Sequence, residues 1–265
     1  MERIKIVLKS FFSILLFMSL TANSIGASAG KQMYYEVKIY TISGPAQEAL
    51  MDAYLKDAYL PALHRAGIPV VGVFKPIETD TAFGKMVYVL ISYKSLDQYG
   101  QIPEKLAKDQ VYLQAGKAFL DAPYNSPAFV RYESILSKAF SSFPELVVPK
   151  FTTQPSERIY EYRSYESATE AKADKKIFMF NDAGEIGIFK SIGANPVFYG
   201  KVLLGSKMPR LLYMTTYADM KSHDEHWVTF RNHPEWKRLS GLEEYKNTTS
   251  KTAAFLLHPT SYSDF

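Results

Sequence analysis

The chain has 265 residues, 47% of them hydrophobic, a formal net charge of +4 and no cysteine. The lack of cysteine excludes disulfides, a thiol nucleophile and the lipidated cysteine of a lipoprotein anchor. Because no block of five or six basic residues occurs, neither nucleic acid nor an anionic membrane surface is a predicted partner.

The first residues have the pattern of a secretory signal peptide. Three basic residues precede an apolar run at Phe11–Leu20, and Ala27-Ser28-Ala29 is a small-residue cleavage site. The apolar run is well short of the roughly 20 residues that span a bilayer, which argues against a retained anchor. We expect residues 1–29 to be removed before Gly30. The mature chain is then predicted to be periplasmic or extracellular, without a membrane segment.

Residues 30–140 are predicted to form a first domain with the element order β-α-β-β-α-β. Tyr34–Thr41 alternates in the way of a half-buried strand. Pro45 is placed to start a helix over 46–65, which Pro61 should kink or break. The other predicted elements are a hairpin of 70–74 and 86–93, a helical region at 96–120 and a strand at 128–136.

Residues 141–156 carry three prolines and little periodicity, so they are predicted to link two domains. The same element order then returns over residues 157–265. The predicted elements are a strand at 159–165, a helical region to 192, a hairpin of 195–203 and 209–217, a helical region at 219–247 and a strand at 252–258.

The sequences of the two halves can be aligned with each other. Tyr35-Glu36-x-Lys38-x-Tyr40 matches Tyr160-Glu161-x-Arg163-x-Tyr165 at an offset of 125, and Tyr93 matches Tyr217 at 124. The chain is therefore predicted to be of the α+β class, with two tandem ferredoxin-like units. The third strand of each unit is apolar on both faces, which favours two sheets that face each other in a pseudo-dimeric α/β barrel.

The polar face of the first strand in each half is the main candidate site. A carboxylate, a cation and a tyrosine at i, i+2 and i+4 point the same way. If the apolar face packs on helices, these side chains should line the space between the sheets as a ligand cavity. A solvated face or a structural ion-pair network is the alternative. The residues are Glu36, Lys38 and Tyr40 in the first half and Glu161, Arg163 and Tyr165 in the second.

Two further motifs lie in the second half. His223 and His226 share a helix face but lack the spacing of a zinc motif and a third ligand, so no metal is predicted. Both are predicted to be surface or helix-packing residues, with Trp227 in the core. Asn232-His233-Pro234-Glu235 has the pattern of a helix start, and Trp236 either packs in the core or closes a pocket. The glycine-rich motifs of nucleotide-binding sites and the nucleophile elbow of hydrolases are absent.

The second half contains Tyr160-Glu161-x-Arg163-x-Tyr165, Lys190-x-x-Gly193, Met214-x-x-Tyr217 and His233-Pro234-Glu235-Trp236. In this combination of motifs it resembles the NIPSNAP family, and the first half does so more faintly. The resemblance implies ferredoxin-like units of the dimeric α/β-barrel type and no established reaction. The first half has Ala107-Lys108-Asp109-Gln110 in place of His233-Pro234-Glu235-Trp236, so a site built on that motif should occur once and not in both halves. Gly184 and Gly187 should bend or break the helix that holds them.

The sequence therefore predicts an exported protein that binds a small ligand or a protein partner, as a monomer or homo-oligomer, without catalysing a reaction. The alternative is an enzyme, because relatives with this barrel shape include cofactor-free monooxygenases and haem-handling proteins. In that case Glu161, Arg163 and Tyr165 would orient a substrate, and His223 or His226 would be the first axial ligands to test. No catalytic residue and no cofactor is assigned.

Overall fold

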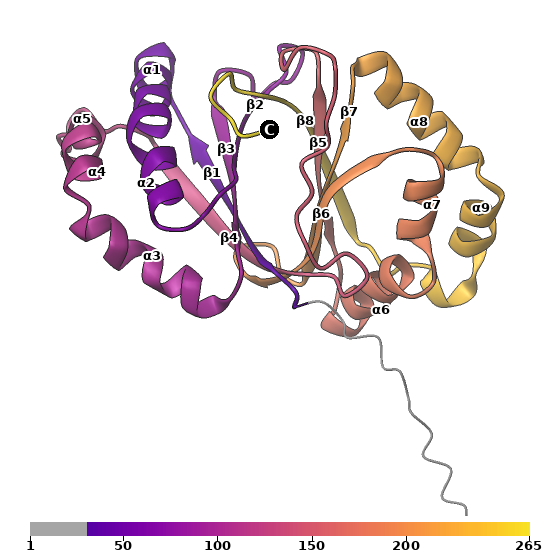
Figure 1. The fold of residues 1–265 in the computed structure, drawn as a ribbon. Coiled ribbons are helices and arrows are strands. Elements are labelled where there is room, and N and C mark those ends of the chain that lie inside the picture. Colours follow the sequence, from indigo (N-terminus) through magenta and orange to yellow (C-terminus); the bar gives the residue numbers. More distant parts are fainter. Residues whose placement is uncertain (1–30) are drawn as a thin grey trace, which may run out of the picture.

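The computed structural model describes residues 31–265, which form a closed barrel of eight antiparallel strands flanked by helices on two opposite sides (Figure 1). The predicted signal peptide, residues 1–29, lies outside the described residues and stays a prediction. Within residues 31–265, no helix is both long enough and apolar enough to cross a membrane.

The first half contributes one four-stranded sheet with its helices. Its strands and α3 occur in the predicted order, and the last strand begins three residues later than expected. The elements are β1 (Tyr34–Thr41), α1 (Pro45–Tyr54), the π-helical turn η1 (Leu55–Tyr59), α2 (Leu60–Arg65), β2 (Val71–Pro76), β3 (Met86–Tyr93), α3 (Leu96–Lys108), α4 (Gln110–Ala115), α5 (Lys117–Leu120) and β4 (Arg131–Ala139).

The second half repeats this order after a crossing segment, residues 141–156, that contains no helix or strand. The crossing segment nevertheless packs on the barrel, since Leu146 and Val148 contact its interior cluster. The elements of the second half are β5 (Ile159–Glu166), α6 (Glu170–Asn181), α7 (Glu185–Ser191), β6 (Asn195–Leu204), β7 (Arg210–Tyr217), α8 (Met220–Asn232), α9 (Pro234–Gly241), the short turn η2 (Glu243–Tyr245) and β8 (Lys251–Pro259).

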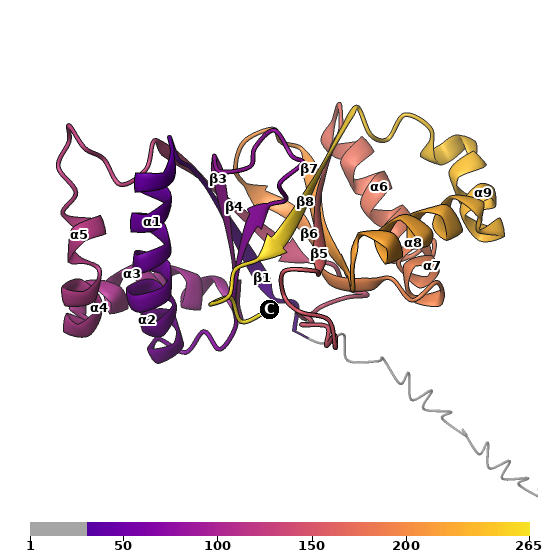
Figure 2. The ribbon, with the colours of Figure 1, turned by 90° about the horizontal axis from the view of Figure 1, so that it is seen from above.

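Around the barrel the strand order is β1-β3-β2-β8-β5-β7-β6-β4, and β4 closes on β1. Each half supplies four consecutive strands, and the halves join where β2 pairs with β8 and β4 with β6. Two ferredoxin-like units thus share one barrel, which confirms the predicted fold class. Seen from above, α1–α5 cover one side and α6–α9 the other (Figure 2).

Pro61 does not break its helix, where the sequence predicts a kink or a break. The chain passes from α1 through the π-helical turn η1 into α2, where Pro61 lies in the first turn. The wider π turn changes the backbone hydrogen-bond register just before the proline, whose missing N–H is tolerated there. The predicted break near Gly184 is confirmed, because Gly184 adopts a left-handed φ of 101° between α6 and α7.

The barrel interior is filled by aromatic side chains. An eight-stranded barrel is just wide enough inside for its own side chains. Phe265, the last residue, also enters the interior, with its ring 5.3 Å from that of Phe74 and 5.9 Å from that of Tyr160. The largest members of this interior cluster are Tyr35, Phe74, Tyr88, Tyr160, Tyr162 and Phe198.

This packing reverses the orientation predicted for the first strands. Tyr35 and Tyr160 point into the barrel, whereas Glu36 and Glu161 point outward to the helix layers. The prediction assumed that apolar residues pack on helices, but a barrel offers a second buried side, and the large aromatic rings occupy it. The predicted site residues therefore cannot line the space between the sheets.

Candidate functional site

The outward face of β5 forms the base of a pocket under α6–α9. Strand alternation puts Glu161, Arg163 and Tyr165 on this face. Their neighbours on β7 are Thr215 opposite Glu161 and Tyr213 opposite Arg163. The pocket has a volume of about 460 Å³.

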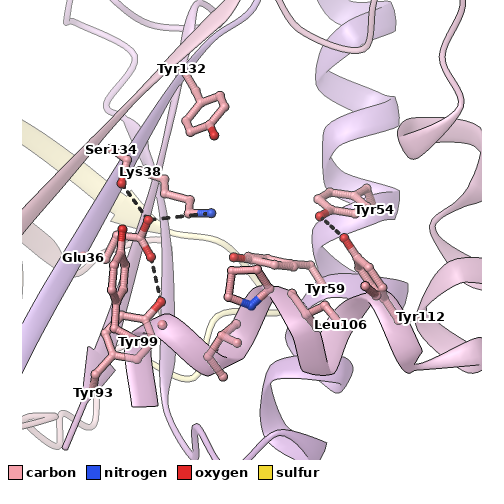
Figure 3. Close-up of a pocket in the computed structure, with 14 residues that line it drawn as sticks. Glu36, Lys38, Tyr54, Tyr59, Tyr93, Tyr99, Leu106, Tyr112, Tyr132 and Ser134 are labelled. Carbon is pink, nitrogen blue, oxygen red and sulfur yellow. Dashed lines mark hydrogen bonds and ion pairs between the residues drawn. The ribbon is translucent and has the colours of Figure 1, made fainter. Parts of the chain in front are cut away.

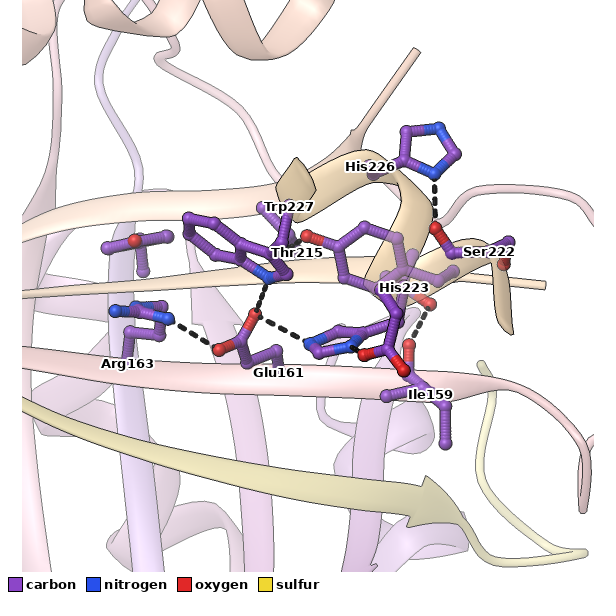
Figure 4. A network of polar contacts seen from close by, with 12 residues as sticks. Ile159, Glu161, Arg163, Thr215, Ser222, His223, His226 and Trp227 are labelled. Atoms are coloured by element: carbon purple, nitrogen blue, oxygen red, sulfur yellow. Dashed lines mark hydrogen bonds and ion pairs between the residues drawn. The ribbon is translucent and has the colours of Figure 1, made fainter. Parts of the chain in front are cut away.

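The carboxylate of Glu161 is the centre of a polar network (Figure 4). Its Oε1 accepts a hydrogen bond of 2.6 Å from Arg163 Nη1, and its Oε2 accepts one of 2.6 Å from Trp227 Nε1. His223 Nε2 lies 3.3 Å from the same Oε2, at ion-pair distance. Since Glu161 is only 3% exposed, these three partners replace the water that it loses on folding.

Helix α8 brings two of these partners to the strand. Asp219 and Ser222 form a capping box, in which each side chain binds the backbone N–H of the other, and this fixes the start of the helix. His223 and Trp227 are four residues apart, so they project from one face of α8 toward β5. The ring of His223 also packs edge-on against Tyr217, at 4.9 Å.

The network couples two titratable groups. Burial alone would raise the pKa of Glu161, but His223, Arg163 and Trp227 together lower it below its ordinary value of 4.5. Burial alone would lower the pKa of His223, but Glu161 and Asp224 raise it above its ordinary value of 6.5. Both shifts favour the charged pair.

Arg163 connects this network to the pocket. Its guanidinium carbon lies 4.5 Å from the centre of the Trp227 ring, a cation–π distance. Its Nε is buried and has no hydrogen-bond partner among residues 31–265. The side chain is thus fixed at one end by Glu161, and the 19% of it that is exposed lines the pocket.

A second buried ion pair stands behind the pocket. Lys176 Nζ of α6 lies 2.8 Å from Glu185 Oε2 of α7, and the two side chains are 7% and 2% exposed. The same Nζ lies 5.5 Å from the ring centre of Trp236, which lines the pocket. The ion pair connects α6 with α7, and the contact of Lys176 with Trp236 connects both to α9.

The structure brings four of the predicted residues together here: Glu161, Arg163, Tyr165 and Trp236. It places Glu36 and Lys38 in a separate pocket at the equivalent position of the first half. Tyr40 lines neither pocket. It is buried at the edge of the first helix layer, where it stacks on Tyr132 at 5.2 Å.

His223 and Trp227 are site residues whose roles the sequence reasoning missed. The sequence predicts a surface or helix-packing position for His223, with haem ligation as the alternative, and a core position for Trp227. Their spacing of four on a predicted helix was visible, but nothing in the sequence places that helix over β5. Their contact with Glu161 depends on the tertiary packing alone.

His226 lies outside the pocket. Its Nδ1 is 2.6 Å from the backbone carbonyl of Ser222, so this nitrogen donates to that oxygen. Within residues 31–265, no group of three or more His, Cys, Asp or Glu side chains has the arrangement of a metal site.

Residues 160–264 match the model of the NIPSNAP family. The second half of the chain is a NIPSNAP domain. All of the residues described above for the second pocket lie inside this domain, while the pocket that holds Glu36 and Lys38 lies outside the match. No curated protein sequence matches the chain.

Solved structures of low sequence identity share the whole barrel. A proposed monooxygenase from Lactobacillus acidophilus is 12% identical with a TM-score of 0.56, over 86% of this chain and 94% of that one. An anthrone oxidase-like protein is 10% identical with a TM-score of 0.50, over 88% and 93%. A proposed chlorite dismutase is 11% identical with a TM-score of 0.50, over 88% and 97%. At these identities the similarity concerns the fold.

Proposed function

We propose that the protein binds a small planar organic ligand in the pocket of its NIPSNAP domain. The observation that carries this proposal is the Arg163 guanidinium, which Glu161 fixes, which lies over Trp227 and which lines the pocket with part of its side chain exposed. A fixed guanidinium suits a planar acceptor such as a carboxylate or a quinone carbonyl.

The aromatic walls support the same class of ligand. Trp227, Trp236 and Tyr165 line the pocket beside Arg163, and such rings bury a planar ligand with little loss of side-chain entropy. A recessed pocket of this kind suits a small molecule better than the flat surface of a protein partner.

Thermal-shift and calorimetric titrations test this proposal with benzoate, 1,4-naphthoquinone and, as a non-planar control, cyclohexanecarboxylate. We expect one of the planar probes to bind, and Arg163→Met to weaken binding on the order of tenfold to a hundredfold. Lys221→Met, which removes a cation at an exposed position of α8, is the control and should bind normally. Binding that is unchanged in Arg163→Met would refute the proposal.

A cofactor-free monooxygenase is the second candidate, and the Glu161–His223 pair favours it. A charged carboxylate–imidazolium pair beside a pocket can stabilise the anion of a weakly acidic substrate. The overall reaction would be RH2 + O2 → R=O + H2O, with O2 as the oxidant. The fold neighbours described as a proposed monooxygenase and as anthrone oxidase-like make anthrone a suitable test substrate. Oxygen uptake with anthrone that disappears in Glu161→Gln supports this candidate, and no uptake above the buffer rate rejects it.

Haem handling fits these residues poorly. The two ring nitrogens of His223 face Glu161 and Asp224, at 3.3 Å and 2.9 Å. His226 lies outside the pocket, with one ring nitrogen bound to the backbone. His223 Nε2 makes no hydrogen bond within residues 31–265, but it is buried and directed at Glu161, so neither histidine is placed as an axial ligand would be.

A further inference from the structure

The first half contains a second pocket, between the β1 sheet face and the helices α1–α4 (Figure 3). Its volume is about 530 Å³. It occupies the place that the NIPSNAP pocket has in the second half, but its side chains differ. It has no histidine or tryptophan among its lining residues, and its cation is a lysine.

Glu36 is satisfied by neutral donors of the protein. Tyr93 donates to Oε2 and Ser134 donates to Oε1, both at 2.6 Å. The carboxylate is 4% exposed. Each of its oxygens already accepts a hydrogen bond, so Glu36 does not need Lys38 as a donor.

Lys38 is therefore a cation with free donors. Its Nζ lies 3.7 Å from Glu36 Oε1, which is beyond hydrogen-bond distance, and it has no hydrogen bond to any residue in 31–265. Burial lowers the pKa of Lys38, but Glu36 and the neighbouring tyrosines raise it by more, so the ammonium group stays charged at neutral pH. An ammonium group has three N–H donors.

The walls around this ammonium group are aromatic. The Nζ lies 5.5 Å from the ring centre of Tyr59 and 5.7 Å from that of Tyr132. Tyr99, Pro103 and Leu106 continue the wall along α3. An inorganic anion could bind the ammonium group but would leave these apolar faces in water, whereas an aromatic acid contacts both.

We propose that the first half holds a second, independent binding site for a planar aromatic carboxylate. Lys38 binds the carboxylate, and the rings of Tyr59, Tyr99 and Tyr132 pack on the aromatic part of the ligand. The site is separate from the NIPSNAP pocket, so its presence does not depend on what that pocket binds.

Isothermal titration of the purified protein with 2-naphthoate tests this site. We expect Lys38→Met to weaken binding on the order of tenfold to a hundredfold. Arg163→Met, in the other pocket, should leave this binding step unchanged. The matched ligands 2-naphthol and acetate should bind much more weakly, because one lacks the carboxylate and the other lacks the rings.

Tyr132→Ala keeps the charge of the site and removes an aromatic wall at a position that is half exposed. It should weaken 2-naphthoate binding while the circular dichroism spectrum stays that of the folded protein. The proposal is overturned if 2-naphthoate does not bind, if it binds equally to Lys38→Met, or if Arg163→Met alone abolishes binding. The last result would assign the probe to the NIPSNAP pocket.

Discussion

Glu36 and Glu161 are the third residues of β1 and β5 and occupy equivalent positions in the two halves, yet their buried carboxylates have different partners. Tyr93 and Ser134 donate to Glu36 through uncharged hydroxyls, which leaves Lys38 without a hydrogen bond in the described chain. Glu161 instead binds Arg163 directly and draws Trp227 and His223 from α8. The same strand position therefore supports two pockets of different chemistry.

Trp227→Phe should destabilise the protein by about 1.5–3 kcal/mol, because it removes the indole donor to a buried carboxylate. Chemical denaturation in urea measures the free energy of unfolding. Trp236→Phe is the matched control, since Trp236 is also half buried but makes no indole hydrogen bond within residues 31–265. Equal losses in the two variants would show that the hydrogen bond contributes nothing.

The stabilisation that His223 provides should depend on pH. Its pKa is higher in the folded state than the ordinary value of 6.5, so its contribution is complete below that value and is lost as pH rises through the folded pKa. The difference in melting temperature between the wild type and His223→Gln should therefore shrink from pH 6 to pH 9. A difference that stays constant or grows over this range would contradict the ion pair with Glu161.

The lowered pKa of Glu161 gives the opposite dependence at acid pH. Its contribution is present above its ordinary pKa of 4.5 and is lost as pH falls through the lower folded value. Glu161→Gln should thus be less stable than the wild type at neutral pH and approach it in melting temperature below pH 4. If the difference in melting temperature between the two proteins stays the same from neutral pH to below pH 4, the charge of Glu161 is not a source of stability.

Lys176→Met should cost about 3–5 kcal/mol, because it leaves Glu185 buried without a cation. Burial already raises the pKa of Glu185 despite the neighbouring Lys176. The double variant Lys176→Met/Glu185→Met should recover most of the loss, since it removes the stranded charge. Lys175→Met is the matched control: its partner Glu244 is exposed, and stability should change little. A double variant as unstable as the single one would show that packing, and not charge, dominates.

The order of strands and helices could be predicted because the alternation in Tyr34–Thr41 and its copy 125 residues later is a local signal. The sequence could not predict which face of those strands points into the barrel. Tyr160 is 0% exposed and Glu161 is 3% exposed, so both faces of β5 are buried, one by the barrel and one by the helices. Polarity alone does not distinguish two buried sides.

The part of the candidate site that depends on local strand geometry could be predicted, and the part that depends on helix docking could not. Glu161, Arg163 and Tyr165 share a strand face, and strand geometry alone brings them together. Trp227 and His223 reach them from a helix more than 50 residues later, so their role depends on how α8 docks. Tyr40 lies on the predicted face, but the pocket forms nearer the start of β1, beside Glu36 and Lys38.

Phe265→Ala should destabilise the protein by about 3–5 kcal/mol, because it empties a place inside the barrel. Phe265 is 6% exposed, and Gly72 makes room for the rings of Phe74 and Phe265, because a Cβ at Gly72 would lie 2.4 Å from the first and 3.1 Å from the second. Phe83→Ala is the matched control, since Phe83 is 50% exposed and should cost less than about 1 kcal/mol. Urea denaturation measures both losses. If Phe265→Ala unfolds at the wild-type urea concentration, Phe265 does not contribute to the stability of the barrel core.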